Sequence, residues 1–426
     1  MRRNYILIVF LCAGISSATS LTLSLDDAVK RGLENNLNLK KSLIDLSTAE
    51  YSAKRLWSEV FPSINASIGT SYSSRLFSGD GFEFNKDGLN NTAGLGISLT
   101  LNAGIPYSMK NIRLAYQTRL LSYEDACNQL ELQITKNFYS LIAERDNLAS
   151  LDYSLQLAQR QYERDQVAHK NGFVGELALM QSRLGLENAR YNLSAAQSAY
   201  ANHQGDFLSQ LGIAQDTDAV FEGKIEIMKI EADPESLIRD HLPQRPDIMS
   251  KRQEIERLEN AVKQLAYSVK APSLRLQTDW NTRNFSPFAD TLSGSASVSI
   301  PIDPWIPGTS RNQSVNSARD AIEKARLDLQ ITEDAAAIQI RSIAANLRNS
   351  WDSIEIARLS LGVAERGYEL TELGFRNGTV ESLKLEDARN NLINARQRLL
   401  QAELSYFYMI LDISAALNMS WKDFMQ

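Results

Sequence analysis

The chain has 426 residues and a formal net charge of −6, with 23% charged and 8% aromatic residues. This length commonly corresponds to two or three domains, and the mildly acidic balance gives no electrostatic reason to expect a nucleic-acid partner. The three histidines and two cysteines match no metal-ligand motif, and the sequence contains no phosphate-binding glycine loop and no nucleophile–base spacing. We therefore expect no catalytic site, no metal site and no cofactor.

Residues 1–20 are expected to form a secretory signal peptide. Two arginines open the segment, a short apolar run follows, and small residues precede the expected cleavage site. Cys12 has two interpretations, either an ordinary apolar residue of the signal or a lipid attachment site. No later stretch approaches the roughly twenty apolar residues of a transmembrane helix, so the protein is expected to leave the cytoplasm without a helical anchor.

The rest of the chain is an internal duplication. Asn-Gly-Phe-Val at 171–174 matches Asn-Gly-Thr-Val at 377–380, and the alignment continues downstream without a gap. The two copies begin about 205–210 residues apart, so the same structural plan is expected twice. The expected organisation is a first repeat at 21–212, an inter-repeat segment at 213–240, a second repeat at 241–417 and a C-terminal tail at 418–426.

Each repeat is expected to contain one very long helix. The stretch 107–171 lacks proline and glycine, and its apolar residues recur at steps of three and four, the spacing of a supercoiled seam. A helix over 108–170 is roughly 95 Å long at about 1.5 Å per residue, too long for one globular core, so it must pack along long partners. The corresponding helix at 309–376 contains Gly362 and Gly367, which weaken it. Shorter helices are expected at about 36–61, 177–211, 247–270 and 381–417.

Two non-helical windows alternate apolar and small polar residues with a period of two. A soluble antiparallel sheet lying on a core fits this pattern. However, no spare amphipathic helix is predicted to cover the apolar face, and the length of about ten residues matches strands that cross a bilayer. Strands are expected at about 62–75, 92–103, 272–283 and 291–302.

Four such strands cannot close a barrel by themselves, because about eight is the smallest usual number. Open strand edges are not tolerated in lipid, so the strands must join those of other copies. Three copies supply twelve strands. The predicted fold class is therefore mainly α, with duplicated antiparallel coiled-coil hairpins and four β-strands in each chain of a trimer.

The sequence also contains Leu25-Asp26-Asp27-Ala28, Phe61-Pro62, Ala271-Pro272 and Arg245-Pro246-Asp247-Ile248. With these motifs, the duplication and the two Asn-Gly turns, the chain resembles the TolC family of outer-membrane efflux and secretion channels over nearly all of the mature sequence. The resemblance implies a homotrimer with a twelve-stranded barrel in outer-membrane lipid and an α-helical tunnel across the periplasm. It also implies a passive duct that serves a tripartite efflux pump or a type I secretion system, with a periplasmic adaptor (membrane fusion) protein and an inner-membrane transporter as partners.

The resemblance also implies where partners bind. In that family the two turns contact the adaptor, and acidic residues just after the second turn narrow the entrance. Here those later positions hold Lys384 and Asp387, with Glu386 adjacent, and they are either an entrance constriction or charges on a solvated helix face. The expected adaptor-contacting residues are Asn171, Gly172, Phe173, Val174, Asn377, Gly378, Thr379 and Val380.

One alternative function stays open. A soluble periplasmic coiled-coil scaffold, or interaction protein, has the same helical pattern if its sheet packs on its own helices. The sequence does not predict which substrate is transported, because the pump that selects the substrate is a different protein.

Overall fold

The computed structural model describes residues 21–72, 89–283 and 290–424. The expected signal peptide with Cys12 lies outside the described residues, as do most of both strand-connecting loops and the last two residues of the tail. None of the described helices combines the length and apolar content needed to cross a lipid bilayer. The chain divides into two compact units: unit 1 is built from Met1–Leu39, Cys127–Asp233 and Arg341–Gln426, and unit 2 from Lys40–Ala126 and Pro234–Ile340.

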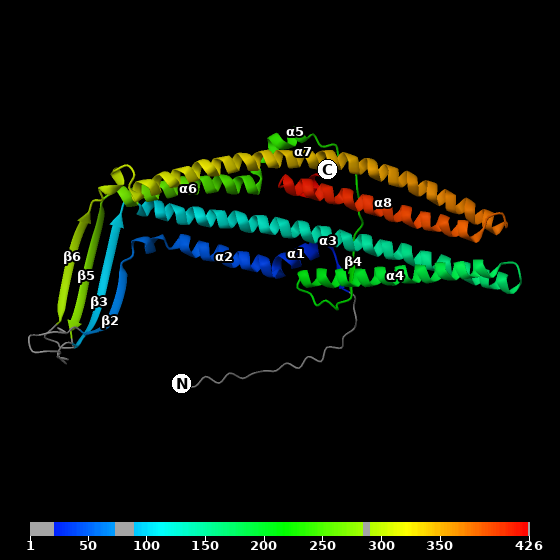
Figure 1. Cartoon of the computed structure of the whole chain (residues 1–426), viewed down its shortest axis with the longest axis horizontal. Coiled ribbons are helices and arrows are strands. Elements are labelled where there is room, and N and C mark those ends of the chain that lie inside the picture. The colour runs from blue at the N-terminus through cyan, green and yellow to red at the C-terminus, as the bar shows by residue number, and fades with distance from the viewer. Residues whose placement is uncertain (1–20, 73–88, 284–289, 425–426) are drawn as a thin grey trace, which may run out of the picture. The chain divides into compact units, whose positions relative to one another are not determined.

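The first repeat contains two short helices, a strand pair and a helical hairpin (Figure 1). The helix expected at 36–61 ends earlier, at Lys54, and a 3₁₀ turn then leads to Phe61, whose extended backbone suits the residue before a proline. The elements are β1 (Leu21–Leu23), α1 (Leu25–Asn35), α2 (Leu37–Lys54), the 3₁₀ turn (Leu56–Val60), β2 (Ser63–Tyr72), β3 (Leu89–Asn102), α3 (Ile105–Lys170) and α4 (Glu176–Gln210).

The second repeat follows the same plan. Helix α7 runs through Gly362 and Gly367 without interruption, and both glycines border open space, so neither marks a close contact. Strand β6 ends before the expected residue 302, because Pro301 cannot donate a ladder hydrogen bond. The elements are β4 (Ala219–Phe221), α5 (Pro234–His241), α6 (Pro246–Lys270), β5 (Ser273–Arg283), β6 (Thr291–Ser299), α7 (Ser310–Arg376), α8 (Ser382–Ala416) and α9 (Trp421–Phe424).

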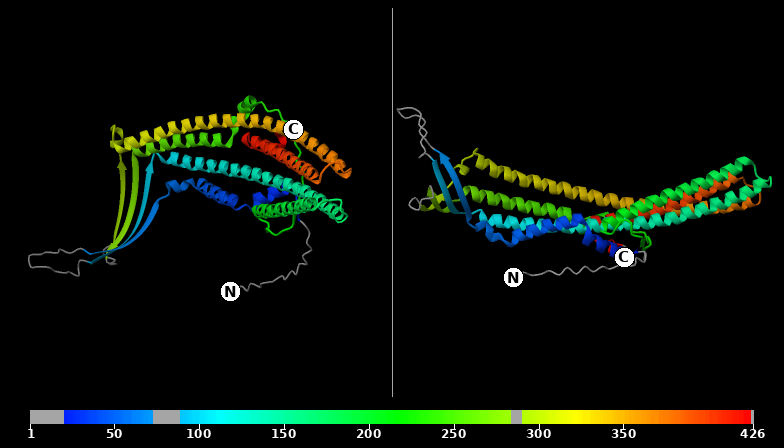
Figure 2. Two further views of the ribbon diagram at one scale, coloured as in Figure 1. Left: turned by 45° about the vertical axis from the view of Figure 1, so that its right-hand side comes forward. Right: turned by 90° about the horizontal axis from the view of Figure 1, so that it is seen from below.

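Unit 2 contains a four-stranded antiparallel sheet in the order β2-β3-β5-β6. The central β3–β5 pair joins the two repeats, so β2 and β6 are left as open edges. Figure 2 shows the strands as one layer, and every residue of β2 and β6 is exposed. The exposed apolar side chains of the sheet are Ile64, Ile68, Tyr72, Leu95, Ile97, Leu274, Leu276, Trp280, Leu292 and Val298.

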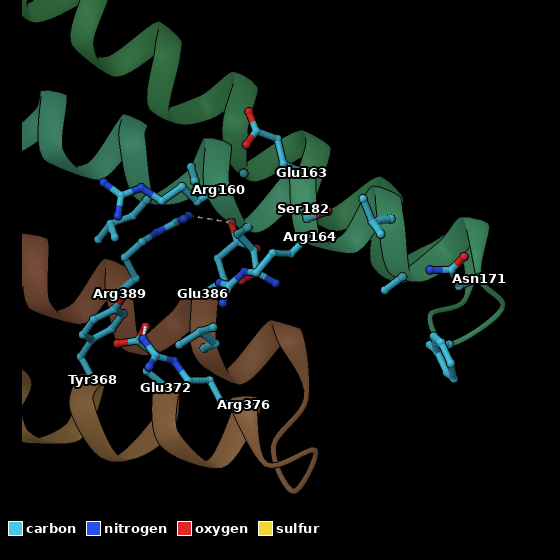
Figure 3. A pocket seen from close by; sticks show the side chains of 18 residues that line it. Arg160, Glu163, Arg164, Asn171, Ser182, Tyr368, Glu372, Arg376, Glu386 and Arg389 are labelled. Atoms are coloured by element: carbon cyan, nitrogen blue, oxygen red, sulfur yellow. Dashed lines mark hydrogen bonds and ion pairs between the residues drawn. The ribbon is translucent and has the colours of Figure 1, made fainter.

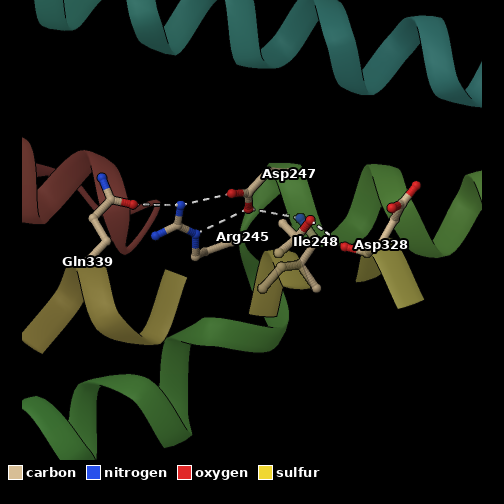
Figure 4. Close-up of polar contacts among 6 residues, drawn as sticks. Arg245, Asp247, Ile248, Asp328 and Gln339 are labelled. Atoms are coloured by element: carbon tan, nitrogen blue, oxygen red, sulfur yellow. Dashed lines mark hydrogen bonds and ion pairs between the residues drawn. The ribbon is translucent and has the colours of Figure 1, made fainter. Parts of the chain in front are cut away.

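The segment that begins α6 is held by a cluster of polar side chains around Arg245 (Figure 4). The guanidinium of Arg245 donates through Nε and Nη2 to the carboxylate of Asp247, at 3.1 and 2.8 Å, and Nη2 also donates to Gln339 on α7. Burial by itself raises the pKa of Asp247, but the hydrogen bonds and charge of Arg245 outweigh it and hold that pKa below its usual value. The cluster therefore ties the start of α6 to α7 within unit 2.

Unit 1 has an aromatic core around the inter-repeat segment. Phe221 of β4 makes edge-on contacts with Phe138 of α3 and Phe207 of α4, with both pairs of ring centroids 5.7 Å apart. Strand β4 also pairs in parallel with β1, so the first described residues of the chain complete this core. Periodicity did not predict this pairing, because three-residue strands are too short to show one.

A second anchor of the inter-repeat segment is a buried tyrosine on α8. The hydroxyl of Tyr406 donates to the carbonyl of Met228, at 2.9 Å, and accepts from the backbone N–H of Ile230, at 3.0 Å. Its ring is fully buried against Leu347, Ile354 and nearby side chains. This pairing satisfies two backbone groups that otherwise lack a sheet partner, and so fixes the inter-repeat segment to α8.

We expect a pH-dependent contribution to stability from His203 of α4. Its Nδ1 lies 2.8 Å from Oε1 of Glu144 on α3, and this hydrogen bond raises the pKa of His203 above 6.5. When the pKa of a histidine is higher in the folded state, its protonation stabilises the fold. The contribution is fully present below the unfolded-state pKa of about 6.5 and is lost as the pH rises through the folded-state pKa. Because both side chains are about one-third exposed, we expect solvent to limit the effect to about 0.5 kcal/mol.

The measurement is thermal unfolding of the wild type and of His203→Gln in detergent at pH 6 and pH 8. The melting temperature of the wild type should exceed that of the variant by a larger margin at pH 6 than at pH 8. Equal margins at the two pH values contradict the assignment.

Candidate functional site

Unit 1 has two helical hairpins, and the Asn-Gly turn that joins the two helices of each hairpin has the same backbone geometry. At the first turn, Gly172 has φ +77°, and the N–H groups of Gly172 and Phe173 donate to the carbonyls of His169 and Ala168. At the second turn, Gly378 has φ +74°, and matching bonds join Gly378 to Phe375 and Thr379 to Gly374. Both are Schellman motifs, in which glycine supplies the left-handed residue that ends the helix.

The side chains around the first turn differ from those around the second. Phe173 is 83% exposed, whereas the equivalent Thr379 donates from Oγ1 back to the carbonyl of Gly374, at 3.0 Å. His169 contacts the carbonyl of Val174 through Nδ1 at 2.8 Å, so this histidine closes its turn. The first turn therefore presents an exposed aromatic ring and the second a small polar surface.

A cavity of about 780 Å³ lies between the α3–α4 and α7–α8 hairpins near these turns (Figure 3). Of the eight expected adaptor-contacting residues, Asn171 and Phe173 line it. Charged residues from both hairpins also line it, including Arg160 and Arg164 of α3 and Arg389 of α8.

The three residues expected near the entrance lie on the same stretch of α8 but do not all face the same way. Lys384 and Asp387 are exposed on the surface of α8. Glu386 instead lines the cavity, where its Oε1 lies 3.6 Å from Nη2 of Arg389. A Cβ on Gly185 of α4 would lie 2.6 Å from the same Glu386 oxygen, so glycine permits the close approach of α4 and α8.

The functional candidates that sequence reasoning missed are Arg389, Arg164 and Tyr368. Arg389 aligns with Arg183 in the duplication, but Arg389 is 8% exposed and Arg183 lies on the surface. Burial lowers the pKa of Arg389 and raises that of Tyr368. No residue pattern distinguishes the two arginines, because their difference arises only where one hairpin faces the other. Over the described ranges, no cluster of His, Cys, Asp and Glu is arranged to hold a metal ion.

Comparison with known proteins identifies relatives of this architecture. A family model described as outer membrane efflux protein matches residues 28–212 and 237–418. The chain is similar to the CmeC outer membrane channel of Campylobacter jejuni, with 19% identity, 92% of this chain and 85% of that chain covered, and a TM-score of 0.75. It is also similar to CusC, with 17% identity, 93% and 92% coverage and a TM-score of 0.74. VceC of Vibrio cholerae is 16% identical, with 93% of this chain and 96% of that chain covered and a TM-score of 0.70.

These matches confirm the resemblance and the mainly helical fold class expected from the sequence. At such low identities the solved structures establish the fold, and a comparison with curated protein sequences finds no match. The family model covers most of both repeats, places the chain in the outer membrane, and describes a family of efflux channels rather than enzymes. The chain belongs to the outer membrane efflux protein family.

Proposed function

We propose that the chain forms a homotrimeric channel that passively conducts substrates across the periplasm and the outer membrane. It serves as the exit duct of a tripartite efflux pump or a type I secretion system. The observation that carries this proposal is the sheet of unit 2, which has a continuous exposed apolar face and two open edges. An apolar face of this kind fits lipid, and open edges in lipid require partner strands.

A second copy is the partner that fits those edges. The strands of one chain are about as long as bilayer-crossing strands, and four of them are too few to enclose a pore. Three copies joined from β2 of one to β6 of the next give twelve strands with no edge left open. The polar faces of the strands, rich in serine and glycine, then line the interior.

Exposed seams on the helices support association with further copies. In unit 1, α4 exposes apolar residues at steps of three, four and seven. This is coiled-coil spacing, and no other described residue covers these side chains. Helix α7 exposes a similar stripe in the same unit, and α2 exposes a shorter one. The stripes are Leu177, Met180, Leu184 and Tyr191 on α4, Ile356, Leu359, Val363, Leu370 and Leu373 on α7, and Leu37, Ile44 and Tyr51 on α2.

The turns of unit 1 are the proposed contact site for a periplasmic adaptor. Asn171 to Val174 and Asn377 to Val380 present identical backbone motifs and mostly exposed side chains. Lys384 and Asp387 follow the second turn on an exposed helix surface and are the proposed entrance charges. The inner-membrane transporter supplies energy and selects the substrate, since a duct of this kind performs neither task.

Disulfide cross-linking between strand edges tests the trimer. In a Cys127→Ser background, cysteine replaces Ser67 on β2 together with Ser293, Ser295 or Ser297 on β6, one pair at a time. Adjacent strands bring such positions within disulfide reach, so at least one pair should give covalent trimers on a denaturing gel.

A matched control pair joins Ser98 on β3 with Ser295 on β6, which are separated by β5 and should remain monomeric. If no edge pair gives trimers, and the protein stays monodisperse without detergent and never partitions with outer membranes, the channel is excluded. The soluble periplasmic scaffold is then the better description.

A further inference from the structure

The cavity between the two hairpins of unit 1 has the size of a small-molecule site. Its volume of about 780 Å³ falls within the usual range of such pockets. Leu157 and Ala158 of α3 and Leu385 of α8 contribute apolar wall. Four arginines and three glutamates supply the charged lining (Figure 3): Arg160, Arg164, Arg376, Arg389, Glu163, Glu372 and Glu386.

Arg389 is incompletely paired in this cavity. It is 8% exposed, and its Nε is buried without a hydrogen-bond partner among the residues that the structure describes. The nearest carboxylate oxygen, Oε1 of Glu386, lies 3.6 Å from Nη2, an ion-pair distance that exceeds a hydrogen bond. A buried guanidinium without its full set of hydrogen bonds is unfavourable, and an anion bound beside it offsets part of that cost.

Two of the other three arginines, Arg376 and Arg164, have different hydrogen-bond partners. Arg376 donates to Glu372 at 2.6 Å, so its charge is paired one helical turn away. Arg164 donates to the neutral amide oxygen of Gln161, also at 2.6 Å. The Gln161 amide in turn donates to both carboxylate oxygens of the buried Asp165. Arg164 is exposed, its guanidinium also lies over the ring of Phe375 at 5.7 Å from the centroid, and it lines the cavity on the α3 side, opposite Arg389 on α8 (Figure 3).

The duplication accounts for only part of this charged lining. Arg160, Glu163, Arg376 and Arg389 have equivalents of the same charge, which are Arg366, Glu369, Lys170 and Arg183. The position equivalent to Arg164 is Leu370, and the position equivalent to Glu386 is Met180. Arg183, the equivalent of Arg389, lies on the surface of α4. The full set of charges comes together where the two hairpins of unit 1 face one another.

We propose that this cavity binds a small organic carboxylate with an apolar body. A carboxylate matches the guanidinium groups that line the cavity from both hairpins and accepts charge-assisted hydrogen bonds from them. Its apolar body lies against the wall that Leu157 and Leu385 provide. A ligand held in this way contacts both hairpins, because Arg164 belongs to α3 and Arg389 to α8.

Binding of benzoate to the purified full-length protein in detergent tests the site, with titration calorimetry as the measurement. Wild type should bind benzoate, and Arg389→Gln should bind at least about tenfold more weakly, because a charge-assisted pair is lost. Arg183→Gln is the matched control, with the same substitution at the equivalent exposed position, and should bind like wild type. Benzyl alcohol, which has the same ring without the charge, should not bind measurably.

Circular dichroism checks that each variant is folded. If Arg389→Gln does not fold, Arg164→Gln takes its place and should weaken benzoate binding severalfold. Equal benzoate affinity in wild type and Arg389→Gln overturns the site, as does equal binding of benzyl alcohol. Inorganic phosphate that binds as tightly as benzoate overturns the organic class of ligand. The readout is binding rather than export, so a failure of this site is distinguishable from a failure of the proposed channel.

Discussion

Replacing Gly378 with proline is expected to abolish export while leaving the trimer assembled. Gly378 has φ +74° and donates its N–H to the carbonyl of Phe375 at 3.0 Å. Proline requires φ near −65° and has no N–H, so it can reproduce neither the turn nor the hydrogen bond, at a local cost of about 3 kcal/mol. The site of a Cβ at Gly378 is open, so the damage comes from the backbone and not from a clash.

The effect on the rest of the protein should be small, because the turn residues Asn377, Gly378 and Thr379 are exposed. Export is measured as dye efflux from cells that express the channel with its pump, and assembly as trimers in mild detergent. Gly362→Ala is the control: this glycine lies inside α7 in open space, where alanine favours the helix by about 1 kcal/mol. Unchanged efflux in Gly378→Pro removes the turn from the adaptor-contact site.

Replacing Ile68 with arginine is expected to prevent assembly in the outer membrane. Ile68 lies in the middle of β2 and is 84% exposed, so the single chain loses almost no packing when it changes. In the proposed barrel the side chain faces lipid near the bilayer midplane, where arginine costs about 2–4 kcal/mol in each copy. The three copies of a trimer carry this cost together.

Ser67→Arg is the matched control, because neighbouring residues of a strand point to opposite faces. In the proposed barrel its side chain faces the aqueous interior, so the same added charge should be tolerated. The amount of trimer in isolated outer membranes is the measurement, with strong loss expected for Ile68→Arg and little for Ser67→Arg. Equal yields of the two variants contradict a lipid-facing role for the apolar side of the sheet.

Several features of the fold are readable in the sequence because they depend on neighbouring residues. The Asn-Gly pairs predict left-handed helix ends, and Gly172 and Gly378 have that conformation. The alternation in the windows predicts strands, and β2 and β5 lie within about one to three residues of the expected bounds. The absence of proline and glycine from 107–171 predicts one long helix, and α3 is continuous over Ile105–Lys170.

The limits of local reasoning are visible inside α7 and in the pairing of β1 with β4. Gly362 and Gly367 suggest a weak second helix, yet α7 continues through both. Propensity costs of about 1 kcal/mol per glycine are easily outweighed by packing along a helix of this length. The pairing of β1 with β4 is likewise invisible to periodicity, since it joins three-residue strands that lie far apart in the chain.

The sequence by itself determined the duplication, the long helices, the two-faced strands and the glycine turns, and through these the family. Each depends on residues close to one another in the chain, whose spacing and backbone preferences act locally. Only the tertiary structure decided that Arg389 is buried while Arg183 is exposed, and that Glu386 lines a cavity while Asp387 faces solvent. Those outcomes depend on which helix surfaces of two hairpins, about two hundred residues apart, meet one another, and no local pattern records that meeting.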